Sequence, residues 1–264
     1  MIIIKSIKSN LLYFVLLITV SPVSSAITLY RGDTRPPEEI FQNGFQSLGS
    51  STDLIRHISG ASCHAGTANS NYVSTSASSV SAYDFASEGA SAEGHEFFYI
   101  YEIESDSSYI DVVATLRRAH EIPGYTAPQR VILGNLAGQA DGEDEVLSQF
   151  LILASSVIRV QIYRTDTEQL IETRENPNFV RGSNEPPQPL ADEFYMQFLP
   201  PSSVSNATMA WYESESGSES DSSSVTACFM GGACSSSSDK KSAKCFQAEV
   251  PPVIQISLFE GDVL

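Results

Sequence analysis

The chain has 264 residues, with 15 Lys and Arg against 32 Asp and Glu, and a formal net charge of −17 at pH 7. This acidic balance argues against a nucleic-acid partner, because affinity for nucleic acid depends largely on Lys and Arg that neutralise phosphates. The length and an apolar content of 42% permit one domain with a proper core plus an appendage, but hardly two large domains.

Residues 1–26 have the pattern of a secretory signal peptide. Lys5 and Lys8 precede an apolar run from Leu11 to Val20, and small residues follow it. The run is about half the length of a membrane span, which needs ~20 residues, so we expect no stable membrane insertion. Cleavage would remove two lysines and take the formal charge from −17 to −19. The pattern therefore predicts a secreted protein that enters an oxidising compartment.

Strand-like and helix-like segments then follow one another in no regular order. Two prolines after Asp33 end the first strand, and Pro37 can open a helix that Asn43-Gly44 stops. Runs of β-branched and aromatic residues predict strands. The predicted strands are Ile27–Arg31, Asn71–Ser76, Phe97–Ile103, Tyr109–Val113 and Val157–Tyr163, and the further helices are Ala82–Ala92 and Ala114–His120. The lack of a βαβ rhythm predicts an α+β fold.

The C-terminal part of the chain has a different composition. After about Ile171 the pattern dissolves into Asn, Pro and Ser, and residues 214–223 are too polar to pack, as in a linker or an exposed loop. Val250–Phe259 is apolar again, which fits either a final strand or a segment that needs covering. We therefore expect one domain at 27–190, and a linker and tail at 191–264.

Three short motifs carry the candidate chemistry: Tyr30-Arg31, Ser74-Thr75-Ser76 and Glu143-x-Glu145. In an extended backbone residues i and i+2 point to the same face, so the two glutamates would meet one ligand. Taken alone, the acidic doublet could equally be a solvated turn, because Asp141 and Asp144 lie beside it.

In this order the motifs resemble those that bind NAD in the catalytic subunits of cholera and pertussis toxins. The match extends through Tyr30–Ile40 and Asn71–Ser76. The resemblance implies the catalytic A subunit of a secreted one-A, five-B toxin with mono-ADP-ribosyltransferase activity. It also implies the ADP-ribosyltransferase fold, with two small β-sheets around an NAD cleft, peripheral helices and an extended C-terminal tail.

The resemblance assigns roles to three catalytic residues. Glu145 would stabilise the oxocarbenium character that develops when the nicotinamide–ribose bond breaks, as a carboxylate does in glycoside hydrolysis, and would hold the ribose hydroxyl. Glu143 would be the general base, because in the arginine-modifying members the first glutamate orients and deprotonates the acceptor. Pertussis toxin, which modifies cysteine, has glutamine at that position. Arginine is therefore the favoured acceptor here. His57 would be a hydrogen-bonding or acid–base partner at the NAD ribose.

The expected NAD-binding residues form two groups. Arg31, Gly32 and Asp33 end the first strand, where the guanidinium fits an NAD phosphate or fixes the pocket backbone. The alternative for Arg31 is a structural salt bridge. In the second group the hydroxyls of Ser74, Thr75 and Ser76 would hold the catalytic glutamate and the backbone in place. NAD would be a co-substrate, and we expect no metal.

Four cysteines lie in a chain bound for an oxidising compartment, where disulfide pairing is the default. They are Cys63, Cys228, Cys234 and Cys245. The resemblance implies that Cys63 pairs with Cys228 and ties the tail over the active site until the bridge is reduced. Cys234 and Cys245 would close a loop of the protease-nicked kind. The sequence leaves the connectivity open, and two purely structural disulfides are the alternative.

The resemblance also implies partners. The C-terminal tail would dock into a pentameric B subunit, and the acceptor would be a host heterotrimeric G-protein α subunit. The protein would pass from the periplasm to the extracellular space and act inside the host cell. Two other functions remain open: an NAD glycohydrolase that uses water as acceptor, and a non-catalytic secreted binding subunit of the same fold.

Overall fold

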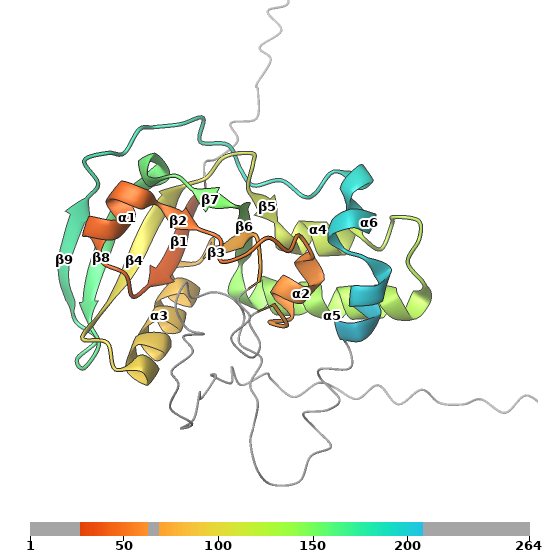
Figure 1. Cartoon of the computed structure of the whole chain (residues 1–264), viewed down its shortest axis with the longest axis horizontal. Helices are drawn as coiled ribbons and strands as arrows, with labels where there is room; N and C mark the ends of the chain where they lie inside the picture. The colour runs from red at the N-terminus through yellow and green to blue at the C-terminus, as the bar shows by residue number, and fades with distance from the viewer. Residues whose placement is uncertain (1–26, 63–68, 208–264) are drawn as a thin grey trace, which may run out of the picture.

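A seven-stranded antiparallel sheet, in the order β5-β6-β3-β1-β4-β8-β9, and a two-stranded sheet of β2 and β7 form the framework (Figure 1). This computed structural model describes residues 27–62 and 69–207. The strands are β1 (Thr28–Asp33), β2 (Phe45–Gln46), β3 (Tyr72–Ser76), β4 (Phe97–Glu104), β5 (Ile110–Asp111), β6 (Glu145–Gln149), β7 (Leu151–Ile152), β8 (Val157–Arg164) and β9 (Leu170–Glu175). The helices are α1 (Pro37–Asn43), α2 (Leu54–Ile58), α3 (Ser79–Glu93), α4 (Val112–Arg118), α5 (Ala127–Glu143) and α6 (Tyr195–Phe198).

The α+β class is confirmed, and most of the predicted elements are present. Helix α1 begins at Pro37 and ends before Gly44, whose φ of 67° suits glycine. The strand predicted at Tyr109–Val113 is wrong beyond Asp111, because the Asp111 side chain accepts a hydrogen bond from Ala114 N and starts α4 there.

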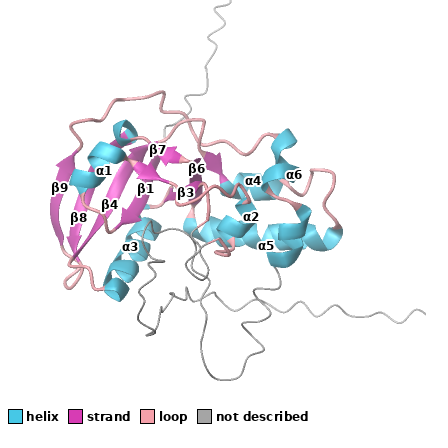
Figure 2. Ribbon diagram, in the orientation of Figure 1, coloured by secondary structure: helices cyan, strands magenta, loops and turns pink. Residues whose placement is uncertain are grey.

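Helices and sheet make two packed halves (Figure 2). Around β1, β4 and β8, α1 and α3 lie on opposite sides, while α2, α4, α5 and α6 gather beside β3 and β6. The second half includes residues beyond the expected boundary at 190. The side chains of Tyr195, Leu199, Val204 and Ala207 are buried in the same cluster as α2, α4 and α5. The packed core therefore continues to Ala207.

Helix α3 lies unusually close to strand β1. A Cβ built on Gly32 would lie 2.5 Å from the carbonyl oxygen of Ala82 and 2.6 Å from the Cβ of Ala86. Ala82, Ala86 and Ala90 are the small buried face of this helix. Only glycine at position 32 allows this approach, so the sequence at the Arg31 motif also sets the position of α3.

We expect Gly32→Ala to lower the free energy of unfolding by about 1–3 kcal/mol, because the added methyl group meets backbone rather than a flexible side chain. Urea denaturation measures the change. Gly138→Ala in α5 is the matched control, since its added Cβ would meet nothing within 4 Å. It should stabilise the protein by about 0.5–1 kcal/mol, and equal effects of the two changes would contradict the packing explanation.

Candidate active site

Arg31 joins β1 to β3 at the point where the two strands separate. The only registered pair between these strands is Tyr30 with Ser76. Beyond it, Arg31 Nη1 donates to the carbonyl oxygen of Ser74 at 2.6 Å. Arg31 Nε lies 3.4 Å from Asp33 Oδ2 without a hydrogen bond, and the guanidinium stacks 5.1 Å from the centre of the Phe45 ring. The buried guanidinium thus fixes backbone, one of the two roles predicted for it.

All three hydroxyls of the Ser74-Thr75-Ser76 motif bond to the segment that carries the glutamates. Ser74 Oγ donates to Glu145 Oε1 at 3.4 Å, and Thr75 Oγ1 donates to the carbonyl oxygen of Val146 at 2.7 Å. Ser76 Oγ donates to the carbonyl oxygen of Glu143 at 2.6 Å. Strand β3 therefore holds the start of β6 through side chains as well as through the antiparallel ladder.

His57 lies at the centre of an ordered chain of hydrogen bonds. It is in α2 and only 1% exposed, with Nδ1 2.8 Å from Ser70 Oγ and Nε2 2.9 Å from Ser74 Oγ. The Tyr72 amide already donates to Ser70 Oγ, and Ser74 donates to Glu145. These bonds assign the proton to Nε2, so that Ser70 donates to His57 and His57 donates to Ser74.

The His57 ring is neutral at physiological pH. Burial, together with the nearby positive charge of Arg31, lowers its pKa to about 3. The 3.7 Å approach of Nε2 to Glu145 Oε1 is therefore not an ion pair. A neutral ring can orient Ser74 by hydrogen bonding, but it cannot supply a proton as an imidazolium.

The backbone from Glu143 to Glu145 has a different conformation from the one predicted from the sequence. Glu143 is the last residue of α5, Asp144 has a left-handed φ of 49°, and Glu145 is the first residue of β6. The expected extended backbone through both glutamates is wrong, because a helix ends between them. The bend still leaves the carboxylates electrostatically linked: burial raises the pKa of both, and the charge of Glu143 raises that of Glu145 further.

Gly32 lies outside this cluster of Arg31, His57, Ser74 and Glu145, and Asp33 touches it only through Arg31. Gly32 faces α3, as described above. The carboxylate of Asp33 accepts from Arg35 Nε and Nη2 at 2.9 and 2.7 Å, so its main partner is the next arginine along the chain. Contact of these two residues with NAD stays a prediction.

Two residues of the site, Ser70 and Arg35, were not predicted from the sequence. Ser70 completes the bonding of His57, and Arg35 neutralises Asp33 beside Arg31. Arg35 could have been noticed as a second cation two residues from Asp33, at the same spacing as Arg31, but nothing in the sequence distinguishes Ser70 from the neighbouring serines. In the part of the chain that the structure describes, no three metal-ligating side chains come together.

The fold agrees with that of a toxin of known structure. Full-length CARDS toxin matches with a TM-score of 0.50 at 21% identity, over 63% of this chain and 31% of that chain. Together with the antiparallel strand order, this match confirms the predicted class: the chain has the fold of the ADP-ribosyltransferase toxins.

At the level of sequence, the chain is similar to pertussis toxin subunit 1. The family model described as pertussis toxin, subunit 1, matches residues 24–129. The pertussis toxin subunit 1 homolog of Bordetella bronchiseptica is 33% identical over 162 residues, 57% of this chain and 59% of that protein. Pertussis toxin subunit 1 of Bordetella pertussis is 36% identical over 120 residues, 42% of this chain and 44% of that protein.

These matches confirm the predicted resemblance to a pertussis-like toxin subunit over part of the chain. They span less than two thirds of the length of either relative. The family-model match includes Arg31, His57 and the Ser74-Thr75-Ser76 motif, and it ends before Glu143 and Glu145. The catalytic roles of the two glutamates therefore stay predictions.

We expect the His57 imidazole to remain neutral throughout the range pH 5–8, because its pKa of about 3 lies well below that range. Nitrogen-15 NMR of the labelled ring measures the protonation state directly. The urea-unfolded protein is the control, in which the ring is hydrated and titrates near 6.5. Titration of His57 near 6.5 in the folded protein would contradict the buried, hydrogen-bonded arrangement.

The buried glutamates should make stability fall as pH rises. Their pKa values are raised above 4.5 by folding, so the folded state binds protons more tightly than the unfolded state. By linkage, this contribution is fully present below pH 4.5 and is lost as pH rises through the folded pKa values. Glu145→Gln should flatten this decline and should be more stable than the wild type at pH 9.

Urea midpoints between pH 4 and 9 test this expectation. Glu88→Gln is the matched control, because it removes one carboxylate from the exposed side of α3. If Glu145→Gln and Glu88→Gln gave the same pH profile, burial of Glu145 would not be the source of the decline.

Proposed function

We propose that this protein is a secreted mono-ADP-ribosyltransferase, the catalytic A subunit of a toxin, which transfers ADP-ribose from NAD to a host protein. The observation that carries the proposal is the buried carboxylate of Glu145, bonded by Ser74, which His57 orients in turn. Cleavage of the nicotinamide–ribose bond develops positive charge at the anomeric carbon. A carboxylate fixed in a site of low polarity stabilises that charge more strongly than a carboxylate in water.

The raised pKa of Glu145 fits a substrate that carries a cation. In the free protein, burial and Glu143 both disfavour the ionised form. The positive nicotinamide of NAD would favour ionisation when it binds, because an opposite charge nearby lowers the pKa of a carboxyl group. NAD supplies the ADP-ribosyl group and the nicotinamide leaving group, while the protein supplies the fixed negative charge.

Glu143 suits the role of general base. Its pKa is raised by burial, which brings it closer to the operating pH, where a base is most effective. We propose that it accepts the proton that an arginine side chain loses when its nitrogen bonds to the ribose carbon. Arginine is thus the favoured acceptor, and a heterotrimeric G-protein α subunit of the host is the favoured target.

We assign His57 and Arg31 positioning roles. His57 is neutral and orients the Ser74 hydroxyl, while Arg31 holds the Ser74 carbonyl. NAD contacts by Gly32, Asp33, Thr75 and Ser76 remain part of the proposal.

The partners and the processing of the chain are further parts of the proposal. We expect a pentameric B subunit to hold the C-terminal tail. The signal peptide at 1–26, the four cysteines and the tail beyond 207 lie outside the described residues. In the part that the structure describes, every helix is too short or too polar to span a bilayer.

Labelled NAD tests the two glutamates separately. With a mammalian cell lysate and the reduced mature protein, Glu145→Gln should lower both nicotinamide release and protein labelling by about 10²–10³-fold, the cost of removing a fixed electrostatic stabiliser. Glu143→Gln should keep most of the nicotinamide release and lose most of the transfer to arginine, because water still serves as acceptor. Mass spectrometry of the labelled protein identifies the acceptor residue.

The outcomes discriminate among the functions. Equal loss of release and transfer in Glu143→Gln would refute the separate roles. Nicotinamide release by the wild type without labelled protein would favour the glycohydrolase. Neither signal, after reduction and proteolytic nicking, would favour a non-catalytic binding subunit.

A further inference from the structure

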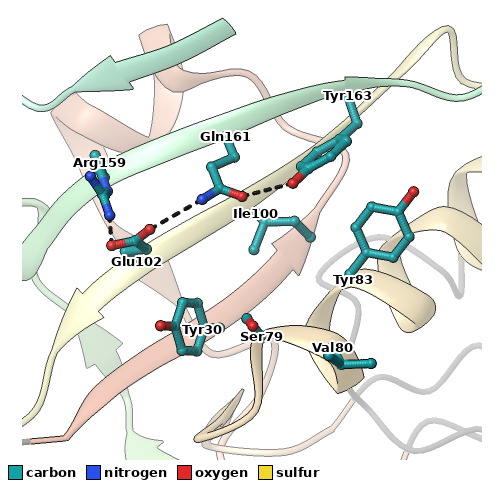
Figure 3. Close-up of a pocket in the computed structure, with 9 residues that line it drawn as sticks. All are labelled: Tyr30, Ser79, Val80, Tyr83, Ile100, Glu102, Arg159, Gln161 and Tyr163. Carbon is teal, nitrogen blue, oxygen red and sulfur yellow. Dashed lines mark hydrogen bonds and ion pairs between the residues drawn. The ribbon is translucent and has the colours of Figure 1, made fainter. Parts of the chain in front are cut away.

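A cavity of about 430 Å³ lies on the face of the sheet that α3 partly covers (Figure 3). Its floor comes from β1, β4 and β8, and the first turns of α3 form one wall. The lining residues are Tyr30, Ser79, Val80, Tyr83, Ile100, Glu102, Arg159, Gln161 and Tyr163. The lining includes no member of the cluster around Glu145, so the proposed reaction leaves this cavity without a role.

The strand register places the cavity on the same sheet face as Glu145. Glu145 pairs with Ser76, Ser76 with Tyr30, and Tyr30 with Glu102. Residues paired directly across antiparallel strands have their side chains on one face. With strands about 4.8 Å apart, Tyr30 lies roughly 10 Å and Glu102 roughly 14 Å from Glu145 along this row.

The charges inside the cavity are already paired. Glu102 is buried, with Arg159 Nε 2.9 Å from Oε2, and Gln161 Nε2 donates to its Oε1 at 3.3 Å. Tyr163 donates to Gln161 Oε1 at 2.8 Å, which extends the chain drawn in Figure 3. Arg159 also lies 3.9 Å from Glu175. A lining with one paired cation and one paired anion does not favour the diphosphate of NAD.

Apart from Ser79 and the tyrosine hydroxyls, the rest of the lining is apolar, and part of it is pre-organised. Ile100 forms the floor between the tyrosines, as Figure 3 shows. The Tyr83 ring packs edge-on against Phe98 and Tyr163, with centroids 5.2 and 5.0 Å apart, so it is held before any ligand arrives. Val80 is 66% exposed at the rim. Tyrosine and arginine around a pocket are the residues that most often dominate protein–protein binding energy.

The rim is acidic. Asp84 and Glu168 are exposed beside Tyr83, whose hydroxyl donates to the carbonyl oxygen of Glu168 at 3.4 Å. Their negative charges complement a basic surface on a partner. Such complementarity steers the partner toward this face and fixes its orientation. A protein that presents an arginine to Glu145 would bring such a surface to this face.

We propose that this cavity holds an apolar or aromatic side chain of the acceptor protein while the acceptor residue lies at Glu145. The inference rests on the proposed transferase activity and adds a determinant of acceptor specificity to it. The register requires the two acceptor residues to lie about 10–14 Å apart on the acceptor surface, since two to three strand spacings separate the sites.

The test compares two exposed valines on helices. Val80→Asp places a charge at the rim of the cavity, whereas Val131→Asp makes the same change on α5, where the valine is 63% exposed. Three rates are measured for each variant: nicotinamide release without acceptor, transfer to the small guanidino compound agmatine, and labelling of protein in a mammalian cell lysate. Val80→Leu keeps the rim apolar and controls for the change of residue.

We expect Val80→Asp to reduce protein labelling about tenfold or more, the range of a buried interface contact. Nicotinamide release and transfer to agmatine should stay within about twofold, because neither uses the cavity. Val80→Leu and Val131→Asp should label protein like the wild type.

Different results overturn different claims. If the wild type releases no nicotinamide, the proposed function fails and the inference with it. If the wild type is active and Val80→Asp labels protein as well as Val131→Asp does, the inference alone fails. If Val80→Asp loses nicotinamide release or agmatine transfer to the same degree as protein labelling, the cavity serves NAD or the scaffold and the inference is also overturned.

Discussion

One buried guanidinium holds the candidate site together. Strands β1 and β3 share a single registered pair, and Arg31 spans the gap beyond it by donating to the Ser74 carbonyl at 2.6 Å. A buried charge is costly unless it is well bonded, and here the Asp33 carboxylate and the Phe45 ring complete its surroundings. Because β3 bonds to the Glu143–Val146 segment through three hydroxyls, fixing β3 fixes the glutamates as well.

Burial then determines the electrostatics. Burial lowers the pKa of His57, which keeps the imidazole neutral, and burial also raises the pKa of Glu145. One physical cause therefore gives the site both an imidazole that positions Ser74 and a carboxyl group that favours a cationic substrate. The β3 ladder connects this cluster to β1 and to the tyrosine-lined cavity on the same face. Catalysis and acceptor recognition would thus share one rigid sheet, which suits sites that need fixed geometry.

The sequence predicted the elements with strong local signals, such as α1 and the β-branched strands, and the residues that meet at Ser74. It missed α5, because small alanines on its buried face and glycines on its other faces give little amphipathic contrast, and it missed β9, an edge strand exposed at most positions. The bend at Asp144 was beyond sequence reasoning, because the left-handed conformation there depends on β3 bonding to both flanking residues. Ser70 could not be identified either, since its contact with His57 exists only in the folded chain.

The most direct test of this account is the rate of NAD cleavage by Arg31→Lys, measured together with circular dichroism. A lysine keeps the charge but cannot contact the Ser74 carbonyl and Asp33 with a planar fork of donors. We predict native secondary structure and a loss of cleavage of about 10²-fold, the effect of a displacement of about 1 Å at a catalytic group. Cleavage at the wild-type rate in a folded Arg31→Lys protein would contradict the claim that this guanidinium positions Glu145.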